Sequence, residues 1–147
     1  MTLTQGIAEI RDRFQQHETD GIAYAEYKRG AWGSKIRKIH RITDVFVKSN
    51  EVLLLIDPVA TEEDSAIHMT VQELLARFIA LAPECGQYSL EACEPEIVIP
   101  EEDASIRFDH PIVATARADS LHLCLLVHVE PGWDQPRKQR WKFWQRT

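Results

Sequence analysis

Residues 112–129, IVATARADSLHLCLLVHV, hold the clearest strand pattern in the chain. From residue 121 onward, leucine and valine at the odd positions alternate with other side chains, as they do in a strand whose successive residues point to opposite faces. The even positions are His122, Cys124, Leu126 and His128. The segment Ala118–Ser120 before this run contains turn-forming residues. Segments 112–117 and 121–129 are therefore predicted to form a hairpin.

Earlier segments also have β patterns. Residues 45–57 read VFVKSNEVLLLID, in which Ser49–Asn50 joins a short strand to an apolar strand that is predicted to be buried on both faces. Residues 35–42, KIRKIHRI, favour a strand with one solvated face, and a short helix is the alternative there. Further strands are predicted over 21–27, 87–92 and 96–99.

Two segments have helical periodicity. A helix is predicted from a cap at Thr4 to about Glu18, because apolar side chains recur there every three or four residues, and Asp20–Gly21 stops it. The sequence TVQE at 70–73 is a capping-box pattern and predicts the start of a second helix, which Pro83 closes.

These elements follow the order α-β-β-β-α-β-β-β-β. They lack the regular alternation of strand and helix that a parallel sheet requires. The fold class is therefore predicted to be α+β, with a mostly antiparallel sheet and two main helices. Residues 1–135 are expected to form a single α+β domain, and residues 136–147 a basic, aromatic C-terminal tail.

The composition is that of a soluble globular protein, with 44% hydrophobic and 27% charged residues in 147. Apolar runs such as 52–56 are far shorter than the roughly 20 residues of a membrane span, so none is expected. Charged residues from Glu9 onward argue against a secretory signal. Three cysteines are too few for a disulfide framework. We expect a cytoplasmic protein.

Charge is segregated along the chain. Residues 1–50 hold nine Lys or Arg and six Asp or Glu, residues 51–135 hold three and seventeen, and residues 136–147 hold five and none. The net charge of -6 hides an acidic middle between two basic stretches.

The sequence contains no recognisable catalytic or metal constellation. His122 and His128 share a predicted strand face but lie about 20 Å apart along it, too far to share a zinc ion whose ligands lie about 2 Å away. The acidic runs at 62–64 and 101–103 are interpreted as solvated loops. We therefore expect no catalytic residue, metal or cofactor. The alternative is a metal-dependent hydrolase or nuclease whose site gathers Asp57, His110, His122 and His128.

One candidate binding site is a basic loop around Trp32, which lies between Gly30 and Gly33. Its cationic binding residues are predicted to be Lys28, Arg29, Lys35, Arg37 and Lys38. An exposed tryptophan among cations can stack on a base or fill a pocket of a partner. The alternative is that Trp32 folds back over the core while the cations solvate a strand face.

The second candidate site is the tail, PRKQRWKFWQRT at 136–147. It could contact a partner protein, a nucleic acid, an anionic membrane surface or the acidic middle of its own chain. The tail residues predicted to bind are Arg137, Lys138, Arg140, Trp141, Lys142, Phe143 and Trp144.

Together these features predict a small, soluble, non-enzymatic binding protein, an adaptor or inhibitor of a larger protein or nucleoprotein complex. It would make contact through the Trp32 loop and the tail. Another protein is the favoured partner, and a nucleic acid bound by the basic stretches is the alternative.

Overall fold

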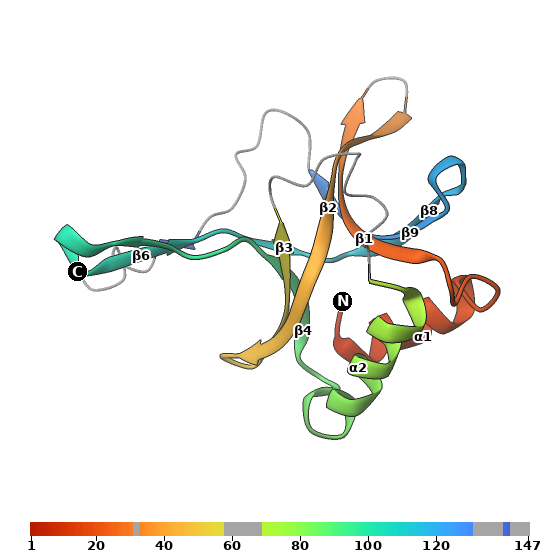
Figure 1. Cartoon of the computed structure of the whole chain (residues 1–147), viewed down its shortest axis with the longest axis horizontal. Helices are drawn as coiled ribbons and strands as arrows, with labels where there is room; N and C mark the ends of the chain where they lie inside the picture. Colours follow the sequence, from red (N-terminus) through yellow and green to blue (C-terminus); the bar gives the residue numbers. More distant parts are fainter. Residues whose placement is uncertain (31–32, 58–68, 131–139, 142–147) are drawn as a thin grey trace.

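The computed structural model describes residues 1–30, 33–57, 69–130 and 140–141. Within these ranges, only the backbone is described at 28–30, 33–37, 129–130 and 140–141. The fold is α+β with two main helices, as predicted (Figure 1). The elements are α1 (Leu3–Arg13), β1 (Gly21–Gly30), β2 (Gly33–Lys48), β3 (Glu51–Asp57), α2 (Val71–Cys85), β4 (Ser89–Cys93), β5 (Ile97–Ile99), the 3-10 helix η2 (Pro100–Glu102), β6 (Ala104–Arg107), β7 (Asp109–Pro111), β8 (Ala114–Ala118), the 3-10 helix η3 (Asp119–Leu121), β9 (Leu123–Glu130) and β10 (Arg140–Trp141).

Seven strands form the main sheet in the order β7-β4-β3-β2-β1-β9-β8. Most neighbours are antiparallel, as predicted, but β1 pairs in parallel with β9, and β3 pairs in parallel with β4. Helix α2 lies between β3 and β4 in the chain and so belongs to the crossover that a parallel pair requires. The main sheet is therefore mixed.

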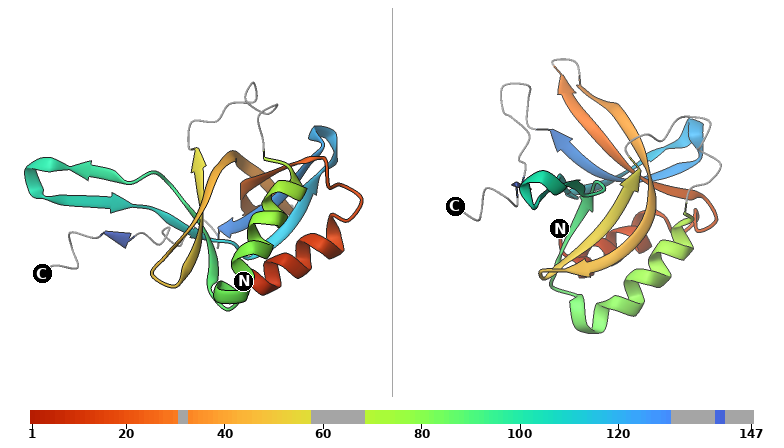
Figure 2. Two further views of the ribbon diagram at one scale, coloured as in Figure 1. Left: turned by 60° about the horizontal axis from the view of Figure 1, so that its bottom comes forward. Right: turned by 60° about the vertical axis from the view of Figure 1, so that its left-hand side comes forward.

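The two edges of the main sheet meet each other. Strands β7 and β8 are its outermost strands, yet only Ile112 and Val113 separate them in the chain. The Ile112 N–H donates to the Leu90 carbonyl on β4 at 3.2 Å, and the Val113 N–H donates to the Val127 carbonyl on β9 at 2.9 Å. The sheet therefore curls until one continuous segment bonds to strands at both of its ends (Figure 2).

Helices α1 and α2 cover one face of the curled sheet, which we call the inner face (Figure 1). Ile7, Ile10 and Phe14 of the predicted apolar stripe are buried there. The hairpin of β2 and β3 turns at Ser49–Asn50, and both turn residues have positive φ, as a type I′ turn requires. As predicted, β3 is buried on both faces, with four of its side chains inaccessible to solvent: Val52, Leu53, Leu54 and Ile56.

The predicted limits of both helices were wrong. Thr2, not Thr4, caps α1, because Thr2 and Gln5 form a capping box while the Thr4 hydroxyl donates to the Gly86 carbonyl at 2.8 Å. The helix ends at Arg13 rather than near Glu18, because the chain there enters turns in which the His17 N–H bonds to the Phe14 carbonyl. Pro83 does not close α2, which continues to Cys85.

The predicted strands also need correction. Residues 35–42 belong to β2, so the helical alternative was wrong. His122 is not in a strand: its left-handed backbone, with φ of 53°, ends the turn after η3, and β9 starts at Leu123. Strands β6 and β7 were missed because neither has a run of alternating apolar residues.

A second sheet of three strands has the order β10-β6-β5. Strands β5 and β6, joined by η2, form a hairpin of residues 97–107 that we call the arm. The arm projects from the main sheet (Figures 1 and 2). Within the described residues, no helix is both long and apolar enough to cross a membrane.

Candidate functional site

The predicted basic loop lies at the far end of the hairpin formed by β1 and β2. The register sets Lys28 opposite Lys35, and it sets the exposed Lys38 opposite Glu26. Arg29 and Arg37 lie in the same two strands, where only the backbone is described. The backbone therefore brings these cationic positions together. Trp32 lies outside the described residues.

The tail is described only at β10, where Arg140 and Trp141 pair with Arg107 and Ile106 of β6. This pairing attaches the tail backbone to the arm of its own chain. The tail and the basic loop belong to different sheets, and so the structure does not join them into one sheet surface. Five predicted binding residues lie outside the described part of the chain: Arg137, Lys138, Lys142, Phe143 and Trp144.

The inner face carries a group of ionisable side chains that the spacing of residues did not reveal. We call it the inner polar cluster, and it comprises Tyr24, Glu26, His40, Glu94, His110 and His128. The Tyr24 ring centroid lies 5.5 Å from that of His40 and 5.9 Å from that of His110. His110 and His128 have ring centroids 5.9 Å apart. These residues come from five segments, so only strand register assembles them.

Hydrogen bonds hold the rings of this cluster in place. The His40 Nδ1–H donates to the Asp57 carbonyl at 3.2 Å, because a carbonyl can only accept. His110 Nε2 lies 3.1 Å from a carboxylate oxygen of Glu94, while its Nδ1 has no hydrogen-bond partner in the described part of the chain. A carboxylate that orients an imidazole is common in catalytic and metal sites. However, the His110 residue is only 1% exposed, so no substrate touches it in this conformation.

The residues of the hydrolase alternative are only partly brought together. His110 and His128 are neighbours, but His122 is exposed in the turn after η3. The Asp57 carboxylate accepts a 2.7 Å hydrogen bond from Arg41 Nη2. The structure therefore does not join the four residues into one site.

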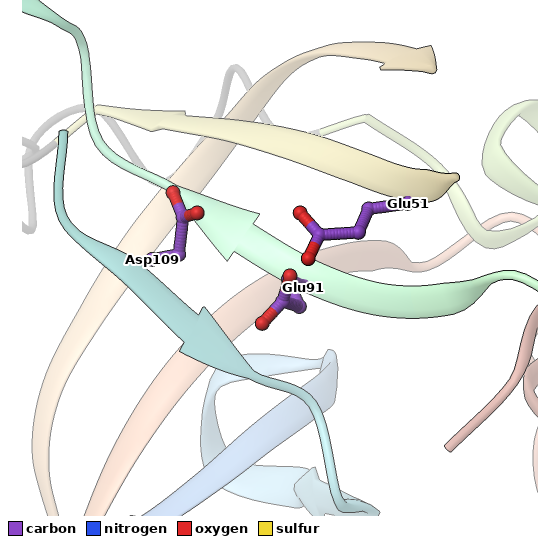
Figure 3. A group of neighbouring side chains, drawn as sticks. All are labelled: Glu51, Glu91 and Asp109. Atoms are coloured by element: carbon purple, nitrogen blue, oxygen red, sulfur yellow. The ribbon is translucent and has the colours of Figure 1, made fainter. Parts of the chain in front are cut away.

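Three carboxylates gather on the opposite, outer face of the sheet. Figure 3 shows Glu51, Glu91 and Asp109, which come from β3, β4 and β7, and each has an oxygen within 4.8 Å of the others. Oxygen ligands of this kind suit Mg²⁺ or Ca²⁺. The spacing of residues in the sequence does not reveal this group, since its members are distant in the chain and none belongs to an acidic run.

Arg107 already supplies a cation to these carboxylates. Its Nε and Nη2 donate to the two Asp109 oxygens at 2.8 and 2.7 Å, and its Nη2 lies 3.8 Å from Glu51. Burial alone lowers the pKa of Arg107, but hydrogen bonding and charge attraction to Asp109 raise it above the ordinary value. The cluster thus fixes the end of the arm to the main sheet.

Burial disfavours the reactive thiolate form of two cysteines, Cys93 and Cys124. All three cysteines are buried. Burial, and to a lesser extent the charge of Asp109, raises the pKa of the Cys93 thiol to about 12. Burial also raises the pKa of the Cys124 thiol. A thiol that stays protonated at neutral pH reacts slowly.

The arm exposes apolar side chains to solvent. Ile97 is 53% exposed and Val98 is 66% exposed, and neither belongs to the buried clusters. The turn of the arm carries Glu101, Glu102 and Asp103, all exposed as the interpretation of a solvated loop expected. The acidic run at 62–64 lies outside the described residues.

No protein-family model matches the chain, and neither a curated protein nor a solved structure matches it significantly.

Proposed function

We propose that this chain is a non-enzymatic binding protein, an adaptor or inhibitor, that contacts another protein through the arm and the C-terminal tail. The exposed pair Ile97 and Val98 is the observation that carries the proposal. Among the exposed large apolar residues in the described part of the chain, these two alone are consecutive. Adjacent exposed apolar side chains on a projecting hairpin are typical of an interaction surface.

The tail contributes to the same region. Arg140 and Trp141 pair with β6, so the basic, aromatic segment starts its contact on the arm. Tryptophan and arginine are the residues that most often dominate binding energy at protein interfaces. The basic loop with Lys28 and Lys35 is the second contact in this proposal, because its cations favour an acidic region of the partner and speed encounter.

The test compares partners that copurify with the tagged full-length chain and with the double variant Ile97→Asp/Val98→Asp. The wild type is expected to retain one protein in stoichiometric amount, and the variant is expected to lose at least about nine-tenths of it, because charges replace the apolar contact. A second variant, Trp141→Ala/Trp144→Ala, is expected to weaken retention as well.

Val113→Asp/Leu121→Asp is the matched control. These side chains are 50% and 54% exposed but lie outside the arm, so retention is expected to stay unchanged. Equal loss in both double variants, or no stoichiometric protein on the wild type, would contradict the proposal. So would a wild-type chain that retains nucleic acid instead of protein.

A further inference from the structure

We infer that strand β5 is a docking edge for an extended, basic segment of the partner, which adds to the arm as a further strand. This inference rests on the proposed function and names the part of the arm that is contacted and the chemistry of its ligand. Strand addition of this kind uses main-chain hydrogen bonds for affinity and alternate side chains for specificity.

Strand β5 lies at the edge of the small sheet. It pairs with β6 on one side, through Ile97 with Ile106, Val98 with Ser105 and Ile99 with Ala104. In the described part of the chain, no strand lies on its other side. Alternate residues of a strand direct their N–H and C=O groups to opposite sides, so β5 also directs main-chain groups away from β6, where no described strand pairs with them. An open edge of this kind is a template for another strand.

The outermost strands of the main sheet differ from β5. There, the segment through Ile112 and Val113 bonds to both β4 and β9, and so the two outermost strands meet. Of the outermost strands whose side chains the structure describes, β5 alone carries large apolar side chains that are exposed. Natural proteins usually protect such edges with charge or a cover, and β5 instead exposes Ile97 and Val98.

The charge of the arm selects a basic ligand. Residues 97–107 contain three acidic residues and one basic residue. The basic residue, Arg107, is buried and bonded to Asp109 through two hydrogen bonds, so it does not neutralise the arm surface. The exposed side chains of Glu101 and Glu102 make the turn of the arm anionic. Such a surface attracts cationic segments and repels both nucleic acid and a second arm.

The chain itself provides a precedent for this type of ligand. The tail has five cations and no acid, and its residues Arg140 and Trp141 form a strand on the other side of β6. One side of the small sheet therefore already accepts a basic extended segment. Strand β5, on the opposite side of β6, offers a second strand of the small sheet for such pairing.

The test uses a fluorescent peptide with the tail sequence, PRKQRWKFWQRT, as a defined basic extended probe of the full-length protein. At low salt we expect saturable binding by fluorescence anisotropy, weakened about tenfold or more by N-methylation of alternate peptide amides, which removes main-chain donors. Ile97→Asp/Val98→Asp is expected to weaken binding by a similar factor, and Val113→Asp/Leu121→Asp is expected to leave it unchanged.

Charge is tested with two double variants of equal net charge. Glu101→Lys/Glu102→Lys is expected to weaken binding about tenfold and to reduce its salt dependence. Glu18→Lys/Glu84→Lys, at exposed positions outside the arm, is expected to have little effect. Equal weakening by both variants would mean that net charge alone attracts the peptide, and would overturn the inference.

Hydrogen exchange identifies the edge. Saturating peptide is expected to slow exchange of the amides of Ile97–Ile99. Protection confined to residues 104–107 would mean that the peptide replaces β10 on β6, and would overturn the inference. An absence of binding, or equal binding of the N-methylated peptide, would also overturn it. The further inference and the proposed function can fail separately. If Ile97→Asp/Val98→Asp loses the partner but the peptide does not add as a strand, the further inference is wrong. The proposed function then stands, with the arm binding its partner through side chains.

Discussion

Asp20 connects three parts of the molecule through one side chain and its backbone. Its carboxylate accepts a 2.7 Å hydrogen bond from Arg117 on β8 and lies 3.1 Å from His17 Nδ1. Its carbonyl accepts from the first N–H of α2, that of Val71. The hydrogen bond from Arg117 is the main cause that lowers the pKa of Asp20, opposed by burial and helped by the charges of Arg117 and His17.

A lowered carboxyl pKa makes stability depend on pH. The Asp20 contribution is fully present above the ordinary pKa of 3.8 and is lost as pH falls through the lowered value of the folded state. Asp20→Asn is therefore expected to lower the urea midpoint at pH 7, and the difference from wild type is expected to shrink below pH 3.8. Asp12→Asn, on the exposed side of α1, serves as the control. A difference that stays constant with pH would refute the ion-pair explanation.

Helix α1 approaches β4 closely because it has a glycine at the contact. A Cβ atom added to Gly6 would lie 2.4 Å from Leu90 Cδ1, and both residues are buried. The N–H of Leu3 and the hydroxyl of Thr4 anchor the start of the helix to the carbonyls of Tyr88 and Gly86. The helix therefore cannot move away without breaking these bonds.

Gly6→Ala tests whether packing outweighs helix propensity. Propensity alone would stabilise the helix by about 1 kcal/mol, whereas overpacking a core costs about 1–3 kcal/mol. We expect a net loss of stability in urea denaturation, because Leu90 is held in the core. Ala8→Gly, at an exposed position of the same helix, is expected to cost about 1 kcal/mol from propensity. A stabilised Gly6→Ala protein would show that Leu90 moves aside freely.

At the scale of the whole molecule, closure of the main sheet organises everything else. The chain leaves the arm, runs along β7, crosses from one edge of the sheet to the other at Ile112 and continues into β8. This path sets His110 beside Tyr24 on the inner face and Asp109 beside Glu91 on the outer face. Both ionisable clusters depend on it.

The closure predicts which amides are protected from hydrogen exchange. The N–H groups of Ile112 and Val113 lie outside any strand, yet both are bonded to strand carbonyls, so we expect them to exchange about as slowly as core strand amides. At least one amide of β5 is expected to exchange quickly in the free protein because that edge is open. NMR-detected exchange measures both. Rapid exchange at 112–113 would mean that the sheet is open between β7 and β8.

Part of the binding proposal could be predicted from sequence. The two basic stretches stand out in the charge pattern, and the structure brings cationic positions 28 and 35 together at the end of one hairpin. Ile97 and Val98 were predicted only as part of a strand. Nothing in their local pattern indicates that the strand is an open edge, because exposure depends on which other strands lie beside it.

The sequence by itself determined the α+β class, the two helices and the hairpin over 45–57, because periodicity and turn residues act between near neighbours in the chain. It also determined the alternation within β9, where Leu123, Leu125 and Val127 are buried on one face. Only the tertiary structure decided the parallel pairings, the closure at 112–113 and the two ionisable clusters. These depend on the register between strands that are distant in the chain, and a register is set by the packing of the whole core.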